Sequence, residues 1–240
     1  MSAHPSALLL VPGLMCDATS WGTVPALLSG VDCRVLDHGM SDSLTQMAEQ
    51  LLEGAPQRFA LAGHSMGGRV ALEVMRLAPE RVTHLALLDT GHLPKAAGAA
   101  GDDEVRKRMA LLAIAREQGV RAMASEWVKG MVAPNRLGDQ PLIESILDMF
   151  ERKSADIFER QLRALIQRPD ATQVLQQIQV PTLVLCGELD AWSPPAQHQA
   201  MAECMLRAPA LVTVADCGHM AMQEQPAAVA QAMRQWLSAM

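Results

Sequence analysis

Several residue types and patterns are scarce or absent in this chain, and each absence excludes some classes of protein. There is no tyrosine, and the five cysteines form no CxxC pair. An odd number of such thiols is typical of a reduced, intracellular protein and argues against a disulfide framework. No apolar run approaches the roughly 18 residues of a membrane span, and the N-terminal MSAHPSALLLVPG lacks the positive region of a signal peptide. We therefore expect a cytoplasmic protein that makes no membrane contact.

Clustered positive charge is also missing. Twenty Lys and Arg residues face 26 Asp and Glu residues, for a net charge of -6, and the longest basic cluster is Arg106-Lys107-Arg108. A chain without a basic stripe is not expected to bind nucleic acid. No HExxH or Cys/His metal spacing occurs, and no GxGxxG follows an apolar run, so we expect neither a metal nor another cofactor.

Short apolar runs alternate with amphipathic segments along the chain. Such runs indicate strands that are buried on both faces, and their alternation with helices predicts an α/β fold with a mostly parallel sheet. Ser193-Pro194 is expected to open one helix as N-cap and first residue, and Val229, Met233 and Met240 share a face of the last helix. The expected strands are residues 7–11, 33–36, 59–62, 82–88, 182–186 and 211–214.

One long stretch contains no strand signal. The pattern therefore predicts an α/β core of residues 1–90 and 169–240, interrupted by a helical cap at 91–168. The cap begins with the Gly- and Ala-rich HLPKAAGAAGDD, which is typical of a mobile hinge. Its expected helices are residues 103–118, 120–131, 142–153 and 155–167.

The strongest chemical signal is RFALAGHSMGGRVALEVM. A predicted strand, the sequence GHSMG and a predicted helix follow one another, which is the context that a GxSxG nucleophile elbow requires. Ser65 would occupy the tip of a tight turn, and side chains at Gly63 and Gly67 would clash across it. The helix beginning at Met66 would direct its N-terminal dipole to the same point, which favours a developing oxyanion. The His64 side chain is expected to point away from Ser65.

A base and an acid for this serine are found in two later loops. His219 follows an apolar run in VADCGHMAMQEQP, where a loop histidine can reach the nucleophile. Asp190 follows another run in VPTLVLCGELDAWSPP, and its carboxylate would fix the tautomer of the histidine. Asp89 is the main rival for the acid, and Glu188 and Asp216 are weaker ones.

Taken together, the motifs LLLVPGL, AGHSMGGRVAL, PERVTHLALLDT, PTLVLCGELD and CGHMAMQEQP resemble the α/β-hydrolase superfamily. The resemblance implies a serine hydrolase with the order Ser65, Asp190, His219. It also implies an oxyanion hole formed by the backbone amides of Leu14 and Met66. Family members usually have two further strands before the first one here, so we expect a trimmed sheet of about six strands.

The residues expected near the mouth of the site are mostly apolar, and the cap has no evident basic cluster facing inward. We therefore predict hydrolysis of small-molecule carboxylic esters that have neutral, short-to-medium acyl groups. A thioesterase, a lactonase or a C–C bond hydrolase would use the same triad, and a ligand-sensing receptor could retain it. The expected substrate-binding residues are Met15, Cys16, Trp127, Met131, Trp192 and Met220.

Overall fold

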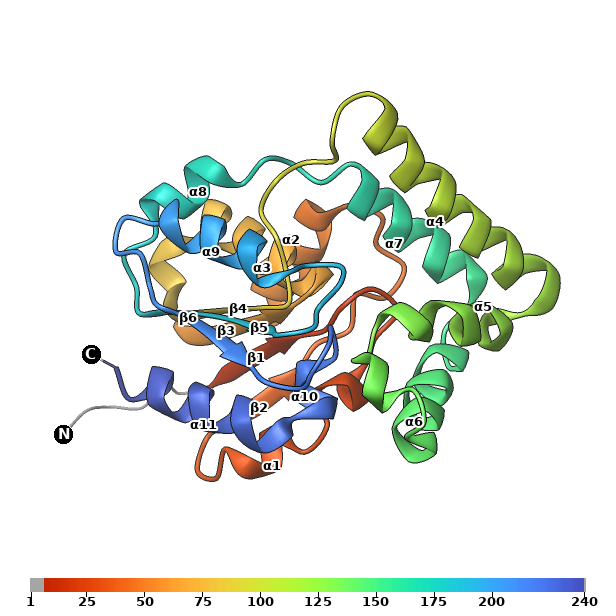
Figure 1. Ribbon diagram of the computed structural model, residues 1–240. Coiled ribbons are helices and arrows are strands. Elements are labelled where there is room, and N and C mark those ends of the chain that lie inside the picture. Colours follow the sequence, from red (N-terminus) through yellow and green to blue (C-terminus); the bar gives the residue numbers. More distant parts are fainter. Residues whose placement is uncertain (1–6, 240) are drawn as a thin grey trace.

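A computed structural model describes residues 7–239 of the chain, so residues 1–6 of the predicted core and Met240 of the last helix face lie outside the described residues. Within this range, six parallel strands form one sheet in the order β2-β1-β3-β4-β5-β6, which confirms the predicted fold class (Figure 1). The strands are β1 (Leu8–Val11), β2 (Cys33–Val35), β3 (Phe59–His64), β4 (Val82–Leu88), β5 (Thr182–Gly187) and β6 (Leu211–Val214).

Alternate residues of the central strands enter two separate hydrophobic cores. Leu9 and Leu61 belong to the core beneath α2 (Leu44–Gly54) and α3 (Met66–Leu77), whereas Leu8 and Ala60 belong to the opposite core. Both faces of β1 and β3 are buried because helices cover both faces of the sheet, as parallel sheets require. The other helices of the sheet layers are α1 (Val24–Leu27), α8 (Thr172–Gln177), α9 (Pro195–Glu203), α10 (Ala221–Glu224) and α11 (Pro226–Leu237).

The start of α9 differs by one residue from the expectation. Pro194, rather than Ser193, is the N-cap residue, and Pro195 is the first helical residue. The reason is that the Ser193 amide donates to the Asp190 carboxylate at 2.9 Å, which holds Ser193 in the preceding loop. None of the helices within residues 7–239 is long and apolar enough to span a membrane.

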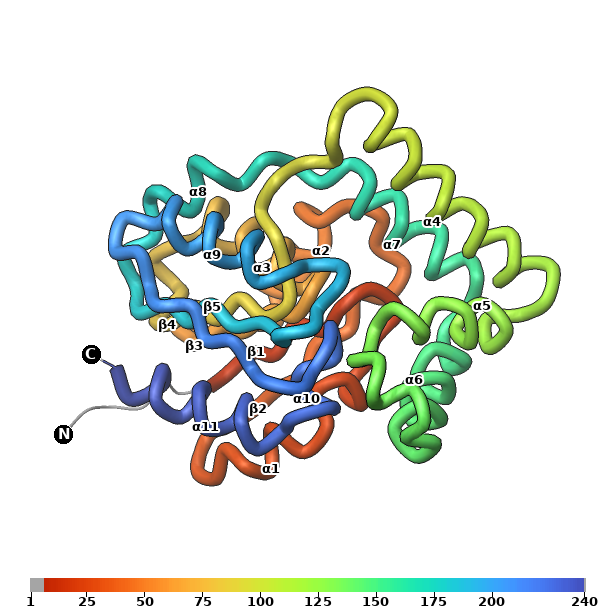
Figure 2. The backbone as a smooth tube through the Cα atoms, in the orientation of Figure 1, coloured from red at the N-terminus to blue at the C-terminus, as the bar shows by residue number. Residues whose placement is uncertain are grey.

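The helices within residues 91–168, which follow β4, lie together beyond one end of the sheet (Figures 1 and 2). The first helix begins at Ala99 rather than at residue 103, directly after Gly98, whose φ of 65° suits glycine. We propose that residues 91–168 form a cap over the core, and we use that name for them. The cap contains α4 (Ala99–Gln118), α5 (Val120–Trp127), η3 (Val128–Gly130), η4 (Pro134–Arg136), α6 (Gln140–Glu151) and α7 (Ala155–Ile166).

Candidate active site

Ser65 lies in a strained turn between β3 and α3. Its φ of 55° and ψ of -117° are rare for a residue with a side chain, and its amide is held by the Leu88 carbonyl oxygen at 3.0 Å. A Cβ atom at Gly63 would collide with the Gly67 carbonyl oxygen, and one at Gly67 with the Val11 carbonyl oxygen. The two glycines therefore let the turn close tightly enough to expose the serine hydroxyl.

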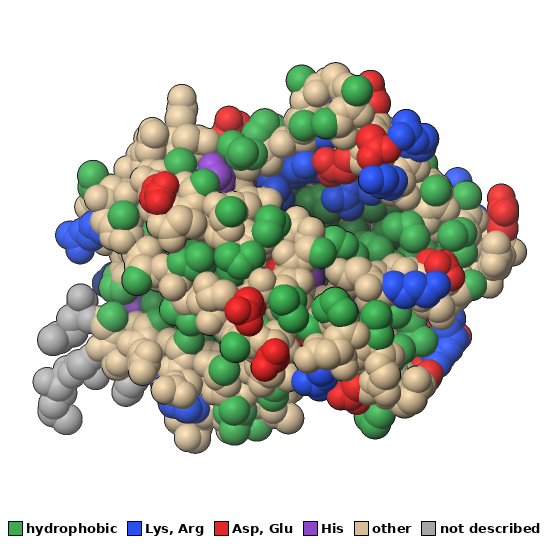
Figure 3. Space-filling model, in the orientation of Figure 1, with side chains coloured by type: hydrophobic (Ala, Val, Ile, Leu, Met, Phe, Trp, Pro, Cys, Tyr) green, Lys and Arg blue, Asp and Glu red, His purple; other side chains and the backbone are tan. Residues whose placement is uncertain are grey.

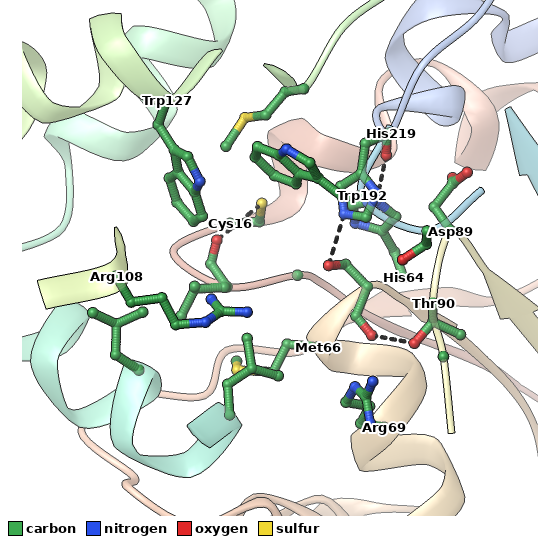
Figure 4. Close-up of a pocket in the computed structure, with 18 of the residues that line it drawn as sticks. Cys16, His64, Met66, Arg69, Asp89, Thr90, Arg108, Trp127, Trp192 and His219 are labelled. Atoms are coloured by element: carbon green, nitrogen blue, oxygen red, sulfur yellow. Dashed lines mark hydrogen bonds between the residues drawn. The ribbon is translucent and has the colours of Figure 1, made fainter. Parts of the chain in front are cut away.

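The three side chains expected to act together meet in a continuous hydrogen-bonded chain. His219 Nε2 lies 2.8 Å from Ser65 Oγ (Figure 4). On the other side of the ring, His219 Nδ1 lies 2.8 Å from Asp190 Oδ2. Asp190 accepts two more hydrogen bonds, from the amides of Trp192 and Ser193, both at 2.9 Å. Both His219 and Asp190 are buried, so water does not compete for these bonds.

The environments of the two candidate acids differ strongly. Burial alone would raise the pKa of Asp190, but the charge and hydrogen bond of His219, together with two amide donors, hold that pKa below its ordinary value. Burial and the charge of Asp190 raise the pKa of Asp89, which accepts a hydrogen bond from the Gly187 amide at 2.9 Å. Both effects favour the protonated form of Asp89. The weaker rivals, Glu188 and Asp216, are both exposed.

A buried carboxylate that the sequence analysis did not single out braces the His219 loop. Glu224 accepts hydrogen bonds from the amides of Gly218 at 2.9 Å, Met220 at 3.3 Å and Ala133 at 2.8 Å. The last of these donors belongs to the cap. A second bond, 2.6 Å from the His219 amide to the Met131 carbonyl oxygen, joins the same loop to the cap. The conformation of the His219 loop thus depends on its hydrogen bonds with the cap.

His64 lies closer to the site than expected. Its ring lines the cavity, lies 5.2 Å from the His219 ring between centroids, and donates from Nε2 to the His219 carbonyl oxygen at 2.8 Å. Burial lowers the pKa of His64 to about 3, so the ring is neutral. Its role in this structure is to support the backbone of His219 rather than to fill space away from the serine.

The backbone amides expected to bind an oxyanion belong to Leu14 and Met66, and both residues line the cavity. Met66 is the first residue of α3, so its N–H has no partner within the helix. The neighbouring Met15 has a φ of 63°, and its amide donates to Gln161 Oε1 of α7 at 2.8 Å. The Met15 side chain is fully buried and lies outside the cavity lining, unlike the expectation, because this backbone turn directs it into the core.

A cavity of about 480 Å³ opens above Ser65, between the core and the cap. Trp192 stacks on Trp127 with their ring centroids 5.5 Å apart, and its ring also lies 4.9 Å from that of His219. Burial raises the pKa of the Cys16 thiol to about 12, so that thiol stays protonated. Five of the six expected substrate-binding residues line the cavity, namely Cys16, Trp127, Met131, Trp192 and Met220.

One end of the cavity is charged, which the sequence analysis did not anticipate. Arg69, Arg108 and Arg168 line it together with Lys107 and Glu104. Figure 3 shows basic side chains gathered at a hollow beside α4, where hydrophobic side chains lie deeper. The premise that the basic cluster of α4 faces only solvent is therefore wrong for Arg108, whose side chain is 23% exposed, although Arg106 is 72% exposed. The helical period separates these two neighbours onto different faces.

Within residues 7–239 no group of three or more His, Cys, Asp or Glu side chains is placed to hold a metal ion. The expectation that the protein needs no metal or other cofactor stays a prediction. It can be checked by assaying hydrolysis after treatment with a chelator.

Residues 8–232 match the model of the alpha/beta hydrolase family, and the chain belongs to that family. It is 28% identical to a malate-bound thermophilic esterase from Thermogutta terrifontis, covering 96% of this chain and 89% of that one, with a TM-score of 0.84. It is 27% identical to a pimeloyl-[acyl-carrier protein] methyl ester esterase from Nitrosomonas europaea, over 76% of this chain and 74% of that protein.

A further relative differs in length. The dihydrolipoyllysine-residue acetyltransferase component of the acetoin cleaving system from Pseudomonas putida is 29% identical over 96% of this chain. The chain spans 63% of the length of that protein.

Proposed function

We propose that this protein hydrolyses carboxylic esters through a Ser65–His219–Asp190 triad and an acyl-enzyme intermediate. The observation that carries the proposal is the pair of 2.8 Å contacts from the two nitrogens of His219, one to Ser65 and one to Asp190. A hydroxyl, an imidazole and a buried carboxylate in this order form a nucleophile, a base and a group that orients the base.

In the proposed reaction, Ser65 Oγ attacks the ester carbonyl carbon while His219 Nε2 accepts the hydroxyl proton. The amides of Leu14 and Met66 donate hydrogen bonds to the oxyanion. Removing one such donor would reduce the stabilisation of the transition state by about 3–4 kcal/mol. His219 then protonates the departing alcohol. A water molecule, deprotonated by His219, attacks the acyl-enzyme, and the acid leaves as Ser65 recovers its proton.

Asp190 acts through His219. Its Oδ2 accepts from Nδ1–H, which leaves Nε2 as the unprotonated nitrogen that faces the serine. Its negative charge also stabilises the imidazolium that forms during each proton transfer. The amides of Trp192 and Ser193 hold the carboxylate in this orientation, so the histidine ring is fixed before the substrate binds.

Two observations support an ester as the bond that is cleaved. Two of the relatives carry the name esterase, and aromatic and apolar side chains around Ser65 suit an acyl chain and its alcohol. Thioesters, lactones and C–C bonds can be cleaved by the same triad, and a ligand-sensing receptor could retain it, so these alternatives are arms of the experiment. The cavity volume of about 480 Å³ supports acyl groups of short-to-medium length.

The experiment compares a panel of esters, thioesters, lactones and C–C bond substrates with wild-type protein and with Ser65→Ala. We expect kcat/KM to be highest for an ester, with the variant at background and its circular dichroism spectrum unchanged. A serine-directed phosphonate should label Ser65 alone, as mass spectrometry of the digested protein would report. Unchanged turnover in Ser65→Ala would overturn the triad, and tight ligand binding without turnover of any substrate would favour a receptor.

A further inference from the structure

The two cap helices α4 and α7, which pack side by side and both line the cavity, change character along their length in the same direction. On α7 and just beyond it, Phe158, Leu162 and Leu165 are followed by Arg168. On α4, which runs antiparallel, Leu111 is preceded by Arg108 and Glu104. The ion pairs Arg116–Glu159 and Arg168–Glu104 fix this antiparallel alignment at its two ends. The cavity therefore has an apolar stretch and a cationic end.

A third guanidinium reaches the cationic end from the core. Arg69 lies on α3 four residues after Ser65, which is about 6 Å along a helix axis. Its Nη1 donates to the Leu93 carbonyl oxygen at 2.9 Å, and no carboxylate of the described residues 7–239 forms an ion pair with it. Arg69 is thus a half-buried cation placed one helical turn from the nucleophile (Figure 4).

The charges at this end do not balance. Arg168 contacts Glu104 through Nη1 at 2.6 Å and Nη2 at 2.8 Å, and Arg108 contacts the same carboxylate at 3.0 Å. Lys107 is paired with Asp103 at 2.8 Å and is largely exposed. At this end of the cavity Arg108 and Arg168 share the Glu104 carboxylate, and Arg69 is paired with no carboxylate of the described residues, so an excess of positive charge faces the ligand space.

An unbalanced cation in such a position is costly unless a ligand compensates it. Burial lowers the pKa of Arg69 to about 9, with the charge of Arg168 acting in the same direction. Burial also lowers the pKa of Arg108 despite the neighbouring Glu104. Removing a guanidinium from water without a matched anion is unfavourable, whereas a planar guanidinium binds a carboxylate through two parallel hydrogen bonds.

We propose that Arg69, Arg108 and Arg168 form a subsite for a carboxylate at the far end of the acyl group, so that the preferred substrates are half-esters of short dicarboxylic acids. This inference rests on the proposed function, because it places the ester at Ser65. The apolar stretch between the two ends receives the methylene chain. Hydrolysis by one water molecule then gives the free dicarboxylate and the alcohol. This proposal replaces the sequence-based prediction that the preferred acyl groups are neutral.

The test compares two substrates that differ only at the end of the acyl chain. Monomethyl adipate carries a carboxylate where methyl hexanoate carries a methyl group, and titration of the released acid gives kcat/KM for both. For the wild-type protein we expect a ratio of at least about tenfold in favour of the anionic ester, because charge-assisted hydrogen bonds contribute about 1.5–3 kcal/mol. A preference for methyl hexanoate would overturn the subsite.

Two neighbours on α4 provide matched variants. Arg108→Met removes a guanidinium that lines the cavity, whereas Arg106→Met removes one that lies outside the lining and contacts Asp103. We expect the anionic-to-neutral ratio to fall by about tenfold in Arg108→Met and to be unchanged in Arg106→Met. Arg69→Met, which alters the core rather than the cap, should lower the ratio similarly. Equal ratios in all of these proteins would overturn the proposal.

A binding measurement separates this proposal from the proposed hydrolysis. Adipate and hexanoate are titrated by calorimetry into Ser65→Ala and into the Ser65→Ala/Arg108→Met double variant. Adipate binding that weakens about tenfold in the double variant supports the subsite even if no ester is cleaved. Ester hydrolysis without any selective adipate binding overturns the subsite and leaves the proposed function standing. Tighter binding of inorganic phosphate than of adipate would overturn the assignment to a carboxylate.

Discussion

Gln161, on helix α7 of the cap, accepts a 2.8 Å hydrogen bond from the amide of Met15, in the loop that follows β1. Gln161 is buried, and Met15 has a backbone conformation with a φ of 63° that few residues adopt. The bond therefore fixes the loop that carries Leu14, one of the two proposed oxyanion donors.

Replacing Gln161 should reduce kcat more than it changes KM. Gln161→Met leaves the buried Met15 amide without an acceptor, which costs about 1–3 kcal/mol and lets the loop move away from the oxyanion. We expect kcat for the best ester to fall by roughly tenfold. Gln161→Glu keeps an acceptor oxygen and should recover most of the activity. Equal losses in both variants would contradict a role that depends on this hydrogen bond.

Glu224→Gln should weaken the fold and slow the reaction together. The amide group of glutamine replaces one acceptor oxygen by a donor, so either the Ala133 amide or both the Gly218 and Met220 amides lose their acceptor. A loss of about 1–3 kcal/mol would lower Tm by several degrees for a chain of this size. Calorimetry and ester kinetics measure the two effects. The exposed Glu188→Gln is the control, and a wild-type Tm in Glu224→Gln would contradict the bracing role.

Asp190→Asn should lower kcat much more than Asp89→Asn does. An amide at position 190 cannot favour the required histidine tautomer, and we expect kcat to fall by about 10³- to 10⁴-fold. Burial and the charge of Asp190 raise the pKa of Asp89, which favours the protonated form that asparagine resembles, so Asp89→Asn should cost far less activity. Steady-state kinetics with circular dichroism as a folding check would decide. The reverse ranking would move the acid to the end of β4.

The buried His64 predicts a loss of stability on acidification. Its pKa falls from 6.5 to about 3 in the folded protein, so between these values the unfolded chain binds more protons. Stability from this group is therefore complete above pH 6.5 and is lost as the pH falls toward 3. From pH 7 to pH 5 the loss is about 2 kcal/mol. Urea unfolding should show a smaller difference between these pH values for His64→Gln, and an identical difference would refute the assignment.

The sequence was sufficient to predict the elements that depend on local pattern. The buried runs predicted all six strands of the sheet, since burial on both faces leaves almost no polar residue in β1, β3 or β5. The glycines around Ser65 were predictable for a similar reason, because the turn excludes a Cβ atom at Gly63 and Gly67.

Features that depend on tertiary contacts were beyond the sequence pattern. The sequence pattern makes Glu224 and Gln161 ordinary polar residues of helices, and only tertiary packing buries them. Arg108 was assigned to solvent because a cluster of three charges suggests an exposed face. Its position four residues after Glu104 and three before Leu111, on the face that α7 covers, was a helical-period signal that could have separated it from Arg106.

The hydrogen bonds that join the cap to the core have a consequence for how substrates enter. The His219 amide donates to the Met131 carbonyl oxygen, the Ala133 amide to Glu224 and the Met15 amide to Gln161, so three of the contacts that hold the proposed machinery cross the boundary of the cap. Lifting the cap as a rigid body would break all of them at once. The opened molecule would be inactive. Closure of the cap over a substrate would restore the reactive geometry, so substrate entry and catalysis would be coupled by the same hydrogen bonds.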